Sequence, residues 1–187
     1  MQRRVFLRGV GDPTLTTGTG SAAVVLLGMM GSGKTTVGRA LAARTGWPYM
    51  DNDELVRAVT GRAPAEIDAT DGEGALHAAE AAALRHALTV PPPLIAGAAA
   101  WVVTDPASAA LLRAAPAVIY LRTRPETLRA RIGGGLGRRE DATDLAWLRS
   151  RHEERDEVYR GLANLTVDTD ELGPEAIAAL VFDLVSG

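Results

Sequence analysis

A glycine-rich turn between an apolar segment and a helix-forming segment constrains the fold of this chain more than any other feature. The stretch GMMGSGKT at residues 28–35 matches the pattern G-x-x-x-x-G-K-[S/T], and it follows the apolar run AAVVLL at residues 22–27. Glycines let backbone N–H groups converge on a phosphate, and the start of a helix adds a partial positive charge. A turn that merely joined strand to helix would leave its lysine without a role. The sequence therefore predicts a phosphate-binding loop.

The residue types in this loop suit a nucleotide. A lysine at this position reaches the β- and γ-phosphates, and the hydroxyl of the next residue is a ligand for Mg²⁺. The loop residues predicted to bind the nucleotide are Gly28, Gly31, Ser32, Gly33, Lys34, Thr35 and Thr36, with Lys34 also catalytic and Thr35 also a metal ligand.

Strand-like and helix-like segments alternate along the rest of the chain, which favours an α/β fold with a parallel sheet wrapped by helices. Strands are expected at residues 22–28, 47–53, 93–103, 117–123 and 165–170. Helices are expected at residues 34–46, 54–60, 72–88, 105–115 and 124–132, and from Pro174 onward. A chain of 187 residues, 47% of them hydrophobic, can bury one sizeable core, so we expect a single domain at residues 22–187.

Composition excludes several classes of function. The net charge of -3 gives no reason to expect a nucleic-acid partner, and no apolar stretch is long enough to span a bilayer. The absence of cysteine excludes disulfides and thiolate metal sites. QRRVFLR at residues 2–8 resembles a twin-arginine export signal, but no apolar stretch follows it. Residues 1–21 are therefore expected to be an N-terminal extension that could be disordered, and the protein is expected in the cytoplasm as a monomer.

Two acidic residues end the second predicted strand. Asp51 and Asp53 are two positions apart, hence on the same side if the strand persists, at the edge where an open parallel sheet keeps its ligands. One carboxylate can hold the metal through water, and the other can accept a proton or a hydrogen bond from an acceptor hydroxyl. The alternative is that Asn52 or Asp53 simply caps the following helix.

Several motifs together resemble the shikimate kinase family. They are LLGMMGSGKTTVGRALAARTG, DNDE, TGRAPAEIDATDGEGALHAAE, RHEERDEVY and TVDTDE, and the similarity runs from about Ala23 to the C-terminus. The resemblance implies a three-layer α/β/α P-loop kinase fold with a five-stranded parallel sheet and a mobile lid at about residues 131–143. It also implies ATP and Mg²⁺, and transfer of the γ-phosphate to a hydroxyl of a small polar molecule.

The resemblance assigns roles to individual residues. Asp51 corresponds to the acid that orients Mg²⁺ through water, and Asp53 to the acid that binds the acceptor hydroxyls and could be the base. Arg138 falls at the catalytic lid arginine, although Arg139 stands where the family has proline, so the register could slip by one. The family likeness further places Arg131 against the adenine and Arg155 on the substrate carboxylate. From the residues alone, charged helix faces are the favoured interpretation of all these arginines.

Two departures from the family pattern fall in the acceptor pocket. His77 stands where the family has a second carboxylate-binding arginine, and it cannot offer a bidentate fork to a carboxylate. The family's Gly-Gly-Gly corresponds to Gly97, Ala98 and Ala99, followed by Trp101 one residue later. We expect His77 and Gly97 to line a rebuilt acceptor site, although His77 could also be a solvated helix residue of no consequence.

The function expected from the sequence is a shikimate kinase-like phosphotransferase whose acceptor is shikimate or a related hydroxy acid, polyol or cyclitol. A gluconate-type or antibiotic-modifying kinase on the same fold is an alternative. A nucleotide-binding protein without kinase activity is a second alternative, which Lys34, Thr35, Asp51 and Asp53 argue against, since a binder has no chemical need for the second acid.

Overall fold

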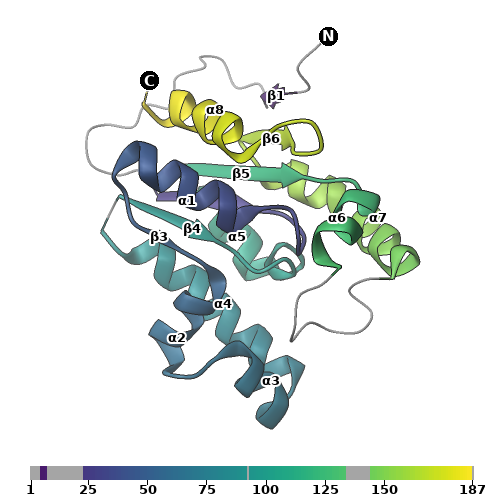
Figure 1. Ribbon diagram of the computed structural model, residues 1–187. Coiled ribbons are helices and arrows are strands. Elements are labelled where there is room, and N and C mark those ends of the chain that lie inside the picture. Colours follow the sequence, from purple (N-terminus) through teal and green to yellow (C-terminus); the bar gives the residue numbers. More distant parts are fainter. Residues whose placement is uncertain (1–4, 8–22, 92, 134–143, 187) are drawn as a thin grey trace.

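The protein is built around one six-stranded sheet, five strands of which are parallel (Figure 1). The computed structural model describes residues 5–7, 23–91, 93–133 and 144–186. The strand order is β1-β6-β5-β2-β4-β3, and β1 alone runs antiparallel to its neighbour. The strands are β1 Val5–Leu7, β2 Ala23–Leu27, β3 Tyr49–Met50, β4 Leu94–Gly97, β5 Ala117–Arg122 and β6 Leu165–Asp168. The expected five-stranded parallel sheet is confirmed.

Helices cover both faces of this sheet, as expected for a three-layer α/β/α fold (Figure 1). They are α1 Lys34–Thr45, α2 Asn52–Thr60, α3 Pro64–Asp71, α4 Glu73–Thr89, the 3₁₀ turn η1 Val102–Thr104, α5 Pro106–Ala114, α6 Pro125–Ile132, α7 Leu145–Leu162 and α8 Pro174–Ser186. Helices α1 and α8 pack on one face, and α4, α5 and α7 on the other. None of the helices in the described ranges is long and apolar enough to cross a membrane.

The central strands are apolar on both sides because each side faces a helical layer. In β2, Val24 and Leu26 belong to the core under α1 and α8, whereas Val25 and Leu27 belong to the core under α4, α5 and α7. All four side chains are fully buried. This is why the strand reads as a continuous hydrophobic run rather than an alternating one. A third, smaller core joins α2, α3 and α4 beside the edge strand β3.

The structure differs from the sequence expectations in four places. Val5–Leu7 pair with β6 and add an edge strand from within the N-terminal extension. The second strand is only Tyr49–Met50, and the third ends at Gly97 instead of residue 103. Helix α3 was not expected, because its eight residues have only one buried side chain, Ile67, and hence no helical repeat of apolar residues.

Candidate active site

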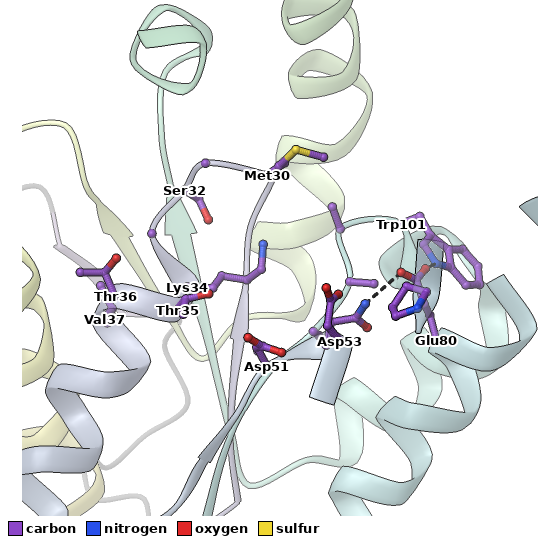
Figure 2. Close-up of a pocket in the computed structure, with 18 of the residues that line it drawn as sticks. Met30, Ser32, Lys34, Thr35, Thr36, Val37, Asp51, Asp53, Glu80 and Trp101 are labelled. Carbon is purple, nitrogen blue, oxygen red and sulfur yellow. Dashed lines mark hydrogen bonds between the residues drawn. The ribbon is translucent and has the colours of Figure 1, made fainter. Parts of the chain in front are cut away.

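One large cavity lies at the carboxyl ends of the parallel strands, where open α/β sheets bind their ligands (Figure 2). Its volume is about 1220 Å³. It is lined by the loop before α1, the start of α2, one side of α4, the segment after β4, and residues of α6 and α7. Most of the sequence-predicted site residues that the structure describes therefore meet in one place. Arg138 and Arg139 lie outside the described residues, as does most of the expected lid.

The predicted phosphate loop has a backbone that only glycines adopt easily. Gly28, Gly31 and Gly33 have φ values of 146°, 81° and 98°. A Cβ at Gly28 would also lie 2.8 Å from the carbonyl oxygen of Leu121, so a side chain there would force the loop away from β5. Ser32 Oγ is buried and has no hydrogen-bond partner among the described residues. The loop therefore forms a concave cradle of the kind that a phosphate requires.

Lys34 stands at the start of α1 and is held over this loop. Its Nζ donates hydrogen bonds to the carbonyl oxygens of Gly28 at 2.7 Å and Met29 at 3.1 Å. Burial lowers the pKa of Lys34 to about 8, an effect that the negative charge of Glu80 opposes. Lys34 is also the only lysine in the chain. The structure thus places a single ammonium group where a nucleotide's terminal phosphates would neutralise it.

Asp51 and Asp53 line the same cavity, but not by alternation along a strand as we expected. Strand β3 ends at Met50, so Asp51 is the N-cap of α2 and Asp53 lies in the first turn of that helix. Asp51 Oδ1 accepts a hydrogen bond from the backbone N–H of Glu54 at 3.0 Å, and Glu54 returns the contact in a capping box. The N-cap of α2 is therefore Asp51, and not Asn52 or Asp53 as the alternative interpretation had it, and this same residue lines the cavity.

The groups near Thr35 suit a magnesium ion. Thr35 and Asp51 both line the cavity and are hard oxygen donors, as Mg²⁺ prefers. Tyr49 also lines the cavity, and the Thr35 side chain lies within hydrogen-bonding reach of its hydroxyl. The described residues hold no cluster of three acidic, histidine or cysteine side chains for a metal. A Mg²⁺ here would therefore depend on phosphate oxygens and water for most of its ligands.

Arg131, expected against the adenine, lies at the last turn of α6 on the nucleotide side of the cavity. Its guanidinium donates to Thr169 Oγ1 at 3.0 Å and to the Thr169 carbonyl oxygen at 2.8 Å. Thr169 follows β6 and is buried, and its hydroxyl also contacts Thr123 at 2.7 Å. Arg131 is thus held in place by the loop after β6, which leaves its planar face as the surface that could stack on a base.

On the acceptor side, Arg155 projects from α7 into the cavity. Its Nε is buried and has no hydrogen-bond partner among the described residues. Nearby, Tyr159 is fully buried, donates to the carbonyl oxygen of Ala100 at 2.5 Å, and stacks on Tyr120 with ring centroids 4.7 Å apart. Arg155 therefore lines the cavity against a rigid aromatic base, with Tyr159 within hydrogen-bonding reach of its guanidinium.

His77 and Gly97, both expected at the acceptor, also line the cavity. His77 is stacked on Trp101, with ring centroids 4.0 Å apart and ring planes at 23°. Gly97 lies under Tyr49, because a Cβ there would be 2.7 Å from Tyr49 Oη. His77 is therefore not a solvated helix residue of no consequence, because its ring packs against Trp101. Ala98 and Ala99 also line the cavity, so their methyl groups take up space there that the family's glycines would leave open.

Sequence reasoning did not assign Asn52, Glu80 or Trp101 to the site. Glu80 is only 8% exposed and accepts hydrogen bonds from Asn52 Nδ2 at 3.0 Å and from the indole N–H of Trp101 (Figure 2). Burial raises the pKa of Glu80, and these two hydrogen bonds oppose that shift. The sequence did carry one signal that could have assigned Glu80 to the site: Glu80 lies one helical turn after His77, on the same face of α4.

Nucleotide affinity is expected to fall as the pH rises through about 8. Bound phosphates favour the charged form of Lys34, whose pKa in the free protein is about 8 instead of its ordinary 10.5. Below pH 8 the ammonium is already present, so affinity is flat. Above pH 8 binding must take up a proton, which weakens affinity by up to about tenfold per pH unit. Titrating ATP from pH 6.5 to 9.5 tests this dependence.

The uniqueness of Lys34 allows a direct measurement of the same titration. Reaction of its amine with acetic anhydride, followed by mass spectrometry, should have a midpoint near pH 8 without nucleotide and a higher midpoint with ATP. The Lys34→Met variant should bind more weakly and without this pH dependence. A midpoint near 10.5 in the free protein would contradict the burial of the ammonium group.

Over most of its length the chain is similar to shikimate kinases. A family model described as shikimate kinase matches residues 30–186. The shikimate kinase of Symbiobacterium thermophilum is 39% identical over 166 residues, 86% of this chain and 94% of that protein. The shikimate kinase of Thiobacillus denitrificans is 35% identical over 167 residues, 87% of this chain and 91% of that protein. Shikimate kinase from Acinetobacter baumannii in complex with shikimate has a TM-score of 0.77 at 28% identity, covering 89% of this chain and 93% of that one. This chain therefore belongs to the shikimate kinase family.

Proposed function

We propose that this protein transfers the γ-phosphate of ATP to a hydroxyl of a small ring molecule that Asp53 and Arg155 hold in the cavity. Membership of the shikimate kinase family makes the protein an ATP-dependent kinase with an alcohol group as acceptor. It favours this class over the gluconate-type and antibiotic-modifying kinases and over a binder without kinase activity. The observation that carries the proposal is that the phosphate loop and Asp53 line one cavity.

The chemistry follows from what each side chain can do there. Lys34 and the loop N–H groups would neutralise the transferring phosphoryl group, which carries its charge on three oxygens. Asp53 is exposed to the cavity and can accept the proton or hydrogen bond of the attacking hydroxyl. Thr35 and Asp51 would hold Mg²⁺, which would supply positive charge against the phosphates when bound. Arg131 would lie against the adenine, and Arg138 would contact the phosphate from the lid.

The cellular setting is also part of the proposal. We place the protein in the cytoplasm as a monomer that uses neither nucleic acid nor a membrane. A chain without cysteine is compatible with a reducing compartment, and its net charge is -3.

Release of ADP in the presence of acceptor tests the function. The protein is incubated with ATP, Mg²⁺ and a panel of ring hydroxy acids, cyclitols and sugars, and ADP formation is followed with each. We expect at least one acceptor to raise the rate far above the background hydrolysis of ATP. Slow hydrolysis that no acceptor stimulates would instead favour the nucleotide-binding protein without kinase activity.

A further inference from the structure

We propose that the acceptor is an uncharged polyhydroxylated ring, of the cyclitol or sugar class, and that Trp101 selects it by forming an aromatic wall with His77. This inference rests on the proposed function, because it concerns the acceptor of the same transfer. It names Trp101 as a specificity-determining residue, a role that the sequence analysis did not assign to it.

The aromatic wall, His77 and Trp101, is a fixed surface. The two rings come from α4 and from the turn before η1, they are stacked, and both line the cavity. The indole N–H of Trp101 is held by Glu80, which fixes the orientation of the ring. Both residues are only partly exposed, so a ligand that covers them displaces little water. Such a surface binds by contact with an apolar face rather than by charge.

Glu80 supports the aromatic wall and does not offer a cation-binding site. Its Oε1 accepts a hydrogen bond from Asn52 Nδ2, its Oε2 accepts one from the Trp101 indole N–H, and the side chain is 8% exposed. Because the side chain is this deeply buried, a ligand cation has little access to its remaining lone pairs. The carboxylate instead holds Asn52 and Trp101 in place through these two hydrogen bonds.

The charges around this end of the cavity disfavour an anionic ligand. The acidic residues that line the cavity from α3 and α4 and from the start of α2 are Asp51, Asp53, Asp68, Glu73 and Glu80, and among the described residues these elements contribute no lysine or arginine to the lining. On the opposite side, Arg151 pairs with Glu154 and lies over the ring of Trp147. A carboxylate directed at the aromatic wall would be desolvated beside acids, with Arg155 across the cavity as its counterion.

An uncharged polyol ring suits these surroundings. Its axial C–H groups form an apolar face that can lie on the negative face of an aromatic ring, while its hydroxyl rim remains available for hydrogen bonds. Asp53 lies between Lys34 and the Glu80–Trp101 pair, so a ring seated on the wall would direct a hydroxyl towards the carboxylate (Figure 2). The guanidinium N–H groups of Arg155, which lines the cavity, can donate to a hydroxyl as well as to an acid.

Acceptor preference in variants of the wall tests the proposal. We expect the native protein to use at least one neutral ring, with myo-inositol and D-glucose among the probes, with a kcat/KM at least about tenfold above that for shikimate. Trp101→Leu should lower this ratio about tenfold or more, because it removes the stacking face and leaves Arg155 in place. Trp147→Leu is the matched control: Trp147 lines the cavity from α7, whereas the stacked pair is formed by His77 and Trp101, so the ratio should change much less.

A second variant keeps the test decisive if Trp101→Leu folds poorly. Trp101→Phe retains an aromatic face and should retain the preference for the neutral ring. Conversely, His77→Arg combined with Trp101→Leu should raise kcat/KM for shikimate about tenfold to a hundredfold, since an arginine at 77 would lie one turn from Glu80 and could hold a carboxylate. His77→Arg alone should raise kcat/KM for shikimate less, because Glu80 still accepts the hydrogen bond of the Trp101 indole.

Each outcome is informative. Preference of the native protein for shikimate over every neutral ring, or equal losses for both classes in Trp101→Leu, would overturn this inference and leave the kinase function standing. Absence of stimulation by either class, with ATP binding intact, would overturn the proposed function and the inference with it.

Discussion

Replacing Lys34 with alanine is expected to abolish phosphoryl transfer without damaging the fold. The Lys34 ammonium group lies 2.7 Å from the carbonyl oxygen of Gly28, inside the phosphate loop, and no other lysine exists to replace it. Removal of one group that stabilises transition-state charge costs about 10²–10³ in turnover, and a P-loop lysine contacts two phosphates. We therefore expect a loss of at least this size in kcat, measured by ADP release with a working acceptor.

The fold should tolerate Lys34→Ala because the native lysine is itself unfavourable there. Burial lowers its pKa, which means that the protein destabilises the charged form of this side chain. Alanine is also the best helix former, and position 34 begins α1. The melting temperature should therefore be unchanged or higher. Arg44→Ala, at the far end of the same helix, is the matched control and should retain full activity. An active Lys34→Ala enzyme would refute the assignment of the loop.

Replacing Asp53 with asparagine is expected to reduce acceptor-stimulated turnover by about 10²–10⁴, the usual contribution of a general base. The amide cannot take the hydroxyl proton, although it keeps the size of the side chain. Affinity for ATP should change little, because Asp53 lies across the cavity from the loop, in the first turn of α2 (Figure 2). The measurement is kcat for the acceptor beside the dissociation constant of ATP.

Asp51→Asn is the matched control for this prediction. Asparagine is as good an N-cap as aspartate, so the capping of α2 should survive and stability should hardly change. If Asp51 orients the metal, the variant should need more Mg²⁺ and should recover activity when Mg²⁺ is raised, whereas Asp53→Asn should not. Identical responses of the two variants would disprove this division of roles.

Much of the fold could be predicted from local sequence alone. The loop pattern, the apolar runs of β2 and β5, and helix α5 with Asp105 as cap and Pro106 in its first turn all have short-range physical causes. Two elements escaped prediction because their stability comes from distant partners. Strand β1 exists through pairing with β6, more than 150 residues later, and α3 is held by packing against α4.

The candidate site also contains some residues that local sequence predicts and others that it does not. Positions 28–36 follow from a contiguous motif, since the chemistry of a phosphate loop needs neighbouring residues in one turn. Asp51 and Asp53 do line the cavity, but not for the geometric reason that we expected. Strand β3 ends one residue before Asp51, and a capping box starts α2 there. The roles of Arg131 and Arg155 depended on family likeness, since charge spacing alone suits any exposed helix.

The sequence by itself determined the fold class and the phosphate loop, because these depend on hydrophobic periodicity and on one contiguous motif. Only the tertiary structure decided how the residues beyond this loop meet in the cavity. Three separate segments contribute Asn52, His77, Glu80 and Trp101, and although family likeness marked two of them, no local pattern relates the four to one another. Their hydrogen bonds and ring stacking arise only when α2, α4 and the turn before η1 pack together. The selectivity of the cavity is therefore a property of that packing, which no local pattern encodes.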